Sequence, residues 1–256
     1  MKRSKVKTSS TERREERRSR DRRRNSYLPV GIGITGGVAL ASIAFLFFKY
    51  QAEEVVTGSA DSYDTAIMKK LHEFDNPTVN KVMELVTHLG SHPAIGTAAG
   101  LTSLALIRKN RNADGWTLIV STAGAMALNS VLKAIFARQR PKELVRQIKL
   151  PKTHSFPSGH SFLSAATYPI VAHHLVQHRS TMMQIVVLSL TGTTVLSVGF
   201  SRMYLGVHFP SDVLGGFAGG LGWLGLTSLT HTLIDKVEGG RERGRKRALP
   251  PSRAKR

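Results

Sequence analysis

Residues 28–48 read LPVGIGITGGVALASIAFLFF, a run of 21 residues without a charged side chain, and Lys49 follows it directly. An apolar helix needs about 20 residues to cross the hydrocarbon core of a bilayer. The run is long for the apolar part of a signal peptide, and no convincing cleavage site follows it. We therefore interpret it as an uncleaved first membrane span. A cleaved signal, for which Arg22-Arg23-Arg24 faintly suggests a twin-arginine type, is the alternative.

Further apolar segments follow along the chain. A polar stretch at 53–77 comes first, and Asn76-Pro77 then indicates a helix start before residues 78–89, whose helical apolar spacing is compatible with the membrane interface. The last apolar segment is rich in glycine at four-residue spacing, which lets helices approach closely in lipid. The sequence thus predicts an all-α fold, a six-span transmembrane helical bundle over residues 28–235. The five later spans are predicted at 93–107, 116–136, 160–176, 182–200 and 213–234.

Most of the excess charge lies at the two ends of the chain. Of the formal net charge of +20, residues 1–26 carry +8 and residues 236–256 carry +7. Arginine-rich ends of this kind are typical of disordered cytoplasmic tails that can touch anionic lipid headgroups. A nucleic-acid partner is disfavoured, because no groove-reading helix or aromatic platform accompanies the charge. We expect basic disordered tails at 1–27 and 236–256.

Basic loops orient the predicted spans. With the N-terminus inside, an even number of spans returns the basic C-terminus to the same side. The basic residues of 108–111 and Arg179 then also fall inside, while the segments 137–160 and 201–212 emerge outside. Cysteine is absent, which excludes a disulfide framework and a thiol nucleophile.

Three polar blocks lie at the predicted outer ends of spans three to six. Charged groups so close to lipid are costly, so their convergence at one face argues for function. Singly, each has a structural explanation, such as a basic side chain snorkelling from a span end. The blocks are Lys133-x6-Arg140-Pro141, Ser155-Phe156-Pro157-Ser158-Gly159-His160-Ser161 and Ser201-Arg202-x5-His208-x3-Asp212.

The residue types in these blocks suit a multiply charged anion such as phosphate. Lys133, Arg140 and Arg202 supply cations, and the guanidinium fork matches phosphate oxygens in bidentate geometry. Ser158 and Gly159 precede a predicted helix start, where free backbone N–H groups and the helix dipole favour an anion.

Two histidines add reactivity. Asp212 follows His208 by four residues, so its carboxylate can bind one ring nitrogen and direct the lone pair of the other outward. His160 has no carboxylate at that spacing, and we assign it the acid that protonates the leaving oxygen. Arg138 lies among the intervening residues of the first block, close in sequence to the site, but it carries no motif role.

The three blocks together resemble the type-2 phosphatidic acid phosphatase family, and all three match in order and at full spacing. The resemblance implies a phosphohistidine intermediate on His208, oriented by Asp212, with His160 protonating the leaving group. It also implies a reaction that uses neither a divalent metal nor another cofactor. The phosphate-binding residues that it implies are Lys133, Arg140, Ser158, Gly159 and Arg202.

The function implied by this resemblance is a membrane phosphatase whose active site, at the outer membrane face, acts on a lipid phosphate. Phosphatidic acid, phosphatidylglycerol phosphate and undecaprenyl pyrophosphate are the suggested substrates, and the sequence does not choose among them. A non-catalytic lipid-binding or transport protein on the same scaffold is the alternative. Vanadium-dependent haloperoxidases share the site, but they are soluble, which the six apolar spans disfavour. The short chain with basic tails favours a bacterial inner (plasma) membrane, and the oligomeric state is left open.

Overall fold

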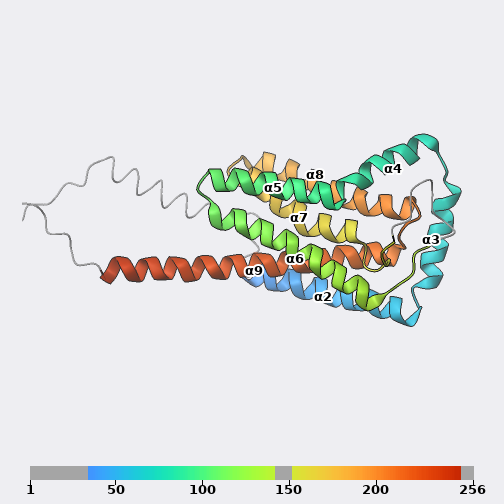
Figure 1. The fold of residues 1–256 in the computed structure, drawn as a ribbon, viewed down its shortest axis with the longest axis horizontal. Helices are drawn as coiled ribbons and strands as arrows, with labels where there is room; N and C mark the ends of the chain where they lie inside the picture. Colours follow the sequence, from blue (N-terminus) through green and yellow to red (C-terminus); the bar gives the residue numbers. More distant parts are fainter. Residues whose placement is uncertain (1–33, 142–151, 249–256) are drawn as a thin grey trace, which may run out of the picture.

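The structure, a computed structural model, describes residues 34–141 and 152–248, with side chains described between residues 36 and 230. Its described residues form helices and no strand. Six of these helices run along the long axis of the molecule (Figure 1). They are α2 (Ile34–Thr57), α5 (His92–Arg108), α6 (Asn112–Phe136), α7 (Gly159–Val176), α8 (Thr181–Tyr204) and α9 (Pro210–Ala248).

The other two helices lie at one end of this bundle. Helix α3 (Asp61–Glu73) stands across the long axis, and α4 (Pro77–Leu89) slants away from it (Figure 1). Asn76 caps α4 as the sequence indicated, since its Oδ1 accepts hydrogen bonds from the N–H groups of Thr78 and Val79. Helix α3 falls within the polar stretch at 53–77, for which the sequence predicts no helix.

The apolar segments of the sequence correspond closely to helices. The predicted span at 160–176 becomes α7, and the segment at 182–200 becomes most of α8. The start of the first span, at 28–33, lies outside the described residues, as does the predicted tail at 1–27. Helix α9 continues past the predicted boundary at residue 235 as far as Ala248.

Glycine allows α9 to pack closely on two neighbours. A Cβ atom at Gly220 would lie 2.3 Å from the carbonyl oxygen of Phe162 in α7. On another face, a Cβ atom at Gly225 would lie 2.8 Å from the backbone nitrogen of Ala41 in α2. Only a residue without a side chain fits such contacts. The close approach that the glycine spacing predicts is therefore confirmed.

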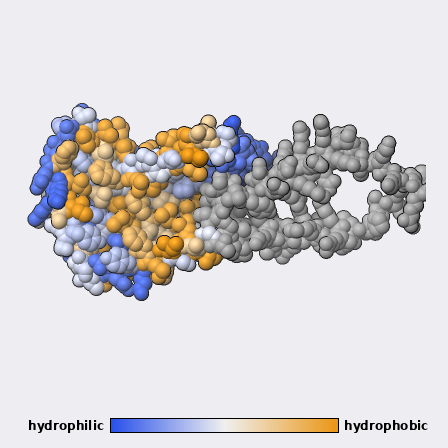
Figure 2. Space-filling model, turned by 180° about the vertical axis from the view of Figure 1, so that it is seen from behind, coloured by the Kyte–Doolittle hydropathy of each residue, from blue (hydrophilic) through white to orange (hydrophobic). Residues whose placement is uncertain are grey.

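Three helical stretches are long and apolar enough to cross a membrane, among the described residues: α6, α8 and residues 210–230 of α9. Large apolar side chains on α8, including Ile185, Leu190 and Leu196, are exposed. Figure 2 shows apolar residues over the middle of the visible face, with hydrophilic residues gathered at the end where α3 and α4 lie. This surface is typical of a protein embedded in lipid.

Candidate active site

The predicted site residues all lie at the end of the bundle where α3 and α4 are found. Helices α6 and α8 contribute residues close to their C-terminal ends, whereas α7 and α9 contribute residues from their first turns. The segments between these helices supply the rest. From these elements come Lys133, Arg140, Ser158, Gly159, His160, Arg202, His208 and Asp212.

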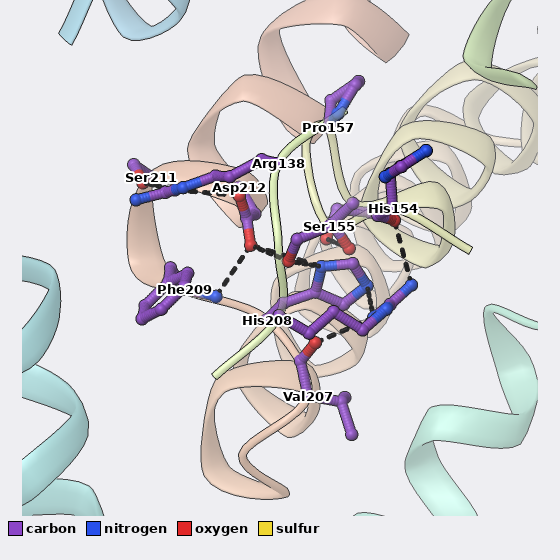
Figure 3. Close-up of polar contacts among 12 residues, drawn as sticks. Arg138, His154, Ser155, Pro157, Val207, His208, Phe209, Ser211 and Asp212 are labelled. Atoms are coloured by element: carbon purple, nitrogen blue, oxygen red, sulfur yellow. Dashed lines mark hydrogen bonds and ion pairs between the residues drawn. The ribbon is translucent and has the colours of Figure 1, made fainter. Parts of the chain in front are cut away.

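His208 is almost fully buried, with 1% of its surface exposed. Its Nδ1 atom lies 3.4 Å from Oδ2 of Asp212 (Figure 3). On the other side of the ring, its Nε2 atom lies 3.0 Å from Nη1 of Arg140. A carboxylate beside Nδ1 favours the tautomer in which Nδ1 carries the proton. The lone pair of Nε2 then points toward the Arg140 guanidinium.

Ser155 takes part in this arrangement, although the sequence analysis assigned it no role. Its hydroxyl donates to Oδ2 of Asp212 and lies 3.3 Å from Nδ1 of His208 (Figure 3). The N–H of Phe209 donates to the same carboxylate oxygen at 2.9 Å. Asp212 is thus held from several sides, and Ser155 couples it to the imidazole.

The three predicted cations bind backbone and hydroxyl oxygens. Lys133 Nζ donates to the carbonyl oxygens of His154 and Ser155 at 2.6 and 3.1 Å. Arg140 donates to the carbonyl oxygens of Thr153 and Val207, at 2.7 Å each. Within 34–141 and 152–230, no ion pair joins either residue to a carboxylate.

Arg202, 4% exposed, is the most enclosed of these cations. Its Nη1 donates to Oγ1 of Thr87 at 2.6 Å, whereas its buried Nε has no hydrogen-bond partner in the part of the chain that the structure describes. A buried donor without a partner is costly. An anion that enters the site would satisfy it.

The excess of positive charge affects His208. Burial lowers the pKa of the His208 imidazole well below its ordinary value, and the cations Arg140, Lys133 and Arg202 lower it further. Burial also lowers the pKa of the Arg140 guanidinium, against the influence of Asp212. The imidazole is therefore neutral at physiological pH, the state in which Nε2 can act as a nucleophile.

The start of α7 differs in one respect from expectation. The N–H of Ser158 is not free, because it donates to the carbonyl oxygen of Asp212 at 2.9 Å. This bond ties the first turn of α7 to that of α9. At Gly159 a Cβ atom would lie 3.0 Å from Oδ1 of Asn129 and 3.7 Å from Cε of Lys133, so glycine leaves the space beside Lys133 open.

His160 lies in the first turn of α7 and packs against the turn between α4 and α5. A Cβ atom at Gly90 in that turn would lie 2.9 Å from Cβ of His160 and 3.1 Å from its Cδ2. The ring is partly exposed, in contrast to that of His208. Among the described residues, no group of three His, Asp or Glu side chains is placed to hold a metal ion.

Arg138, which carries no motif role, contacts the site directly. Its Nη1 donates to Oδ1 of Asp212 at 2.9 Å, and its Nη2 donates to Oδ2 of Asp64 at 2.8 Å. Asp64, a residue of α3, is fully buried. No sequence motif pointed to Asp64, because its contact with Arg138 spans 74 positions of the chain.

Comparisons with known proteins identify the family of this chain. A family model described as PAP2 superfamily matches residues 114–235. The crystal structure of a transmembrane PAP2 type phosphatidylglycerolphosphate phosphatase from Bacillus subtilis superimposes with a TM-score of 0.67 and 32% identity, covering 77% of this chain and 96% of that one.

Named relatives point the same way. Phosphatidylglycerophosphatase B of Bacillus subtilis is 36% identical over 69% of this chain and 87% of its own length. Decaprenylphosphoryl-5-phosphoribose phosphatase of Mycobacterium tuberculosis is 33% identical over 68% of this chain and 88% of its own length. Undecaprenyl-diphosphatase of Sulfolobus acidocaldarius is 32% identical over 50% of this chain and 60% of its own length. With relatives matched over most of their length and the three blocks gathered at one buried site, the chain belongs to the PAP2 superfamily and is an integral membrane phosphatase.

Proposed function

We propose that this phosphatase hydrolyses a lipid phosphate through a covalent phosphohistidine intermediate on His208. One observation carries the proposal: Nε2 of His208 lies 3.0 Å from Nη1 of Arg140, on the ring edge opposite to Asp212. A phosphate that binds the Arg140 guanidinium would place its phosphorus next to the lone pair of Nε2. This proximity supports attack by Nε2 on a phosphate held by Arg140.

Phosphate binding is assigned to the cations around the imidazole and to the start of α7. The unpartnered Nε of Arg202 and the absence of paired carboxylates at Lys133 and Arg140, within the described residues, support this assignment. Fixed cations stabilise the charge that accumulates on the phosphoryl oxygens in the transition state. The binding set is Lys133, Arg140, Ser158, Gly159 and Arg202.

The reaction has two steps. In the first, the Nε2 lone pair of His208 forms a bond to phosphorus while the bond from phosphorus to the lipid oxygen breaks. His160 donates its proton to that oxygen, and the lipid product leaves. Asp212, on the Nδ1 side, balances the positive charge that the phosphorylated ring acquires.

In the second step, His160 accepts a proton from a water molecule. The water oxygen attacks phosphorus, and the bond from phosphorus to Nε2 breaks. Inorganic phosphate leaves with the oxygen of the water, and both histidines return to their starting states. The same residue therefore serves as acid first and as base second.

We infer that α2, α5, α6, α7, α8 and α9 are the six membrane spans of a domain at 28–235. The parallel course of these helices supports this count (Figure 1). The site lies at the end opposite to the basic residues of 108–111 and Arg179, which the positive-inside rule places in the cytoplasm. With both basic tails cytoplasmic, the site opens at the outer face of a bacterial inner membrane.

The substrate class is a phosphomonoester or a diphosphate of a membrane lipid. Phosphatidylglycerol phosphate is the first to test, because it corresponds to the names of a 36% identical relative and of the similar crystal structure. Prenyl diphosphates such as undecaprenyl pyrophosphate come second, and phosphatidic acid completes the panel.

The test uses the full chain, purified in detergent, with phosphate release measured on all three lipids in the presence of EDTA. We expect turnover of at least one lipid, its loss in His208→Ala, and a phosphorylated protein trapped by acid quench. The control is His178→Ala, which changes an exposed histidine at the opposite end of the bundle and should keep full activity. Turnover by His208→Ala, or no release from any of the three lipids, would refute the proposal.

A further inference from the structure

Helix α3 brings a buried carboxylate to the edge of the active site. Asp64 is fully buried, whereas Asp61, one turn earlier, has a side chain that is 70% exposed. Asp64 accepts hydrogen bonds from the N–H of Ser211 at 2.9 Å, from the Ser211 hydroxyl, and from Nη2 of Arg138 at 2.8 Å. Burial raises the pKa of the Asp64 carboxyl, whereas the hydrogen bonds from Ser211 and Arg138 lower it. All three contacts are donors, which favours the ionised carboxylate.

Arg138 lies between Asp64 and the catalytic carboxylate. Its Nη1 donates to Oδ1 of Asp212 at 2.9 Å and to the Ser211 hydroxyl at 2.6 Å (Figure 3). Its Nη2 donates to Asp64. Its guanidinium also stacks 4.5 Å above the centre of the Phe209 ring. The result is a row of alternating charges that runs from Asp64 through Arg138 and Asp212 to His208.

The alternation has an electrostatic consequence. A largely buried Arg138 without a counter-charge would compete with the imidazole for the negative charge of Asp212 and so weaken the attraction between Asp212 and His208. Asp64 offsets the positive charge of Arg138 from the far side. The negative charge of Asp212 then remains available to stabilise the ring of His208, which becomes positive when Nε2 is phosphorylated. In a buried site such effects are only weakly screened.

We propose that Asp64 is a positioning residue that acts through Arg138 on the Asp212–His208 pair, and so sets the rate of the chemical step. The inference rests on the proposed function, since it assumes that His208 is the nucleophile. It assigns a catalytic contribution to α3, a helix that precedes the segment matched by the PAP2 superfamily.

The ionisation of Arg138 is consistent with this assignment. Burial alone would lower the pKa of its guanidinium, but the carboxylates of Asp212 and Asp64 more than offset burial and raise it. Arg138 is thus a permanent cation, and it holds both carboxylates through separate nitrogens of one planar group.

The test is a double-mutant cycle on the full chain in detergent: wild type, Asp64→Asn, Arg138→Gln and the double variant, with kcat and KM measured on the lipid that is turned over. We expect Asp64→Asn to lower kcat about 10- to 100-fold, as is typical for partners that orient a reactive group, with KM unchanged. In the Arg138→Gln background, Asp64→Asn should lower kcat little further, because the guanidinium through which Asp64 acts on Asp212 is absent.

The matched control is Asp61→Asn. Asp61 contacts the same Nη2 of Arg138 at 3.1 Å from the same helix, but it faces solvent. Exposed ion pairs contribute little, so kcat should stay within about fivefold of the wild-type value. Equal losses in Asp61→Asn and Asp64→Asn would mean that burial is irrelevant, and would overturn the proposal.

Two further measurements separate positioning from folding. Competitive inhibition by inorganic phosphate, which binds without a bond to Nε2 of His208, reports an intact phosphate pocket and should be unchanged in Asp64→Asn. If that variant does not fold, Arg138→Lys replaces it: one ammonium group cannot hold two carboxylates as a guanidinium does, so kcat should fall. Wild-type kcat in Asp64→Asn or in Arg138→Lys, or equal loss from Asp64→Asn in both backgrounds, overturns the inference. His208→Ala, assayed in parallel, tests the proposed function separately.

Discussion

His208 faces Arg140 through Nε2, at 3.0 Å from Nη1, with both side chains buried. A histidine beside a carboxylate is often positively charged, but here the cations outweigh that influence. Burial, followed by Arg140, Lys133 and Arg202, lowers the pKa of His208 well below its ordinary value of 6.5. In the free enzyme the imidazole of His208 is therefore neutral. The pH dependence of the reaction can be predicted from this.

The first prediction concerns the acid limb of kcat/KM. His208 must be neutral to attack, so activity is lost only as the pH falls through its lowered pKa, and the limb should lie below pH 6.5. Replacing Lys133 with Gln removes one positive charge, which raises the pKa of His208 and moves the limb to higher pH. The measurement is kcat/KM against pH for wild type and Lys133→Gln.

The substrate titrates as well, but it does so equally with both enzymes. The difference in pH between the two acid limbs therefore reports the change in the pKa of His208. As a matched control, Lys109→Gln removes the same charge at the opposite end of the bundle. A limb that does not move in Lys133→Gln would contradict the electrostatic account.

The second prediction concerns Ser155. Its hydroxyl is fully buried and joins Asp212 to Nδ1 of His208. Ser155→Ala leaves the buried Asp212 carboxylate short of one donor, at a cost of about 1–3 kcal/mol. Asp212 should then orient the imidazole less well, so kcat should fall about tenfold or more. Steady-state kinetics on the lipid substrate provide the measurement. The control is Ser130→Ala, whose exposed hydroxyl only donates to a carbonyl of its own helix. Equal kcat for the two variants would exclude a role for Ser155.

The apolar spans and the three blocks could be predicted because each signal is local. The span predicted at 160–176 differs from α7 by one residue, since charged or turn-forming residues bound it on both sides. Helix α3 was missed because its buried surface rests on few residues, among them Met68, in an otherwise polar segment. Length and apolarity alone do not reveal so short an amphipathic helix.

The role of Arg138 could not be predicted for a different reason. Its partners, Asp64 and Asp212, lie 74 positions away on either side along the chain. Only the packing of α3 against the first turn of α9 brings the three together. The position of Arg138 inside the first block indicated that it lies near the site. Nothing local distinguished Asp64 from the other acidic residues of 53–77.

The third prediction tests the close packing of α9. A Cβ atom at Gly220 would overlap the Phe162 carbonyl, at 2.3 Å, and lie 2.9 Å from Cβ of Ala165. Gly220→Ala should therefore destabilise the protein by about 1–3 kcal/mol, the usual cost of overpacking. At Gly222 a Cβ atom meets only Cβ of Ala44, at an ordinary 3.6 Å, so Gly222→Ala is the matched control. Thermal unfolding in detergent should show a lower Tm for the first variant alone. Equal Tm values would contradict the packing seen here.

The last prediction concerns Thr87, at the end of α4, whose hydroxyl accepts a hydrogen bond from Nη1 of Arg202 at 2.6 Å. Nε of the same guanidinium has no partner among the described residues, so Thr87 fixes the group while leaving a donor for the substrate. Thr87→Val keeps the shape but removes the acceptor. A second unpaired donor in so enclosed a site costs about 1–3 kcal/mol, and the guanidinium should turn away from the phosphate position.

Vanadate, which mimics the five-coordinate phosphoryl group, should therefore inhibit this variant about tenfold more weakly. Thr193→Val, which removes an exposed hydroxyl on α8, should bind vanadate as the wild type does. Unchanged vanadate inhibition in Thr87→Val would show that Arg202 is held without α4, and that this helix does not shape the phosphate pocket.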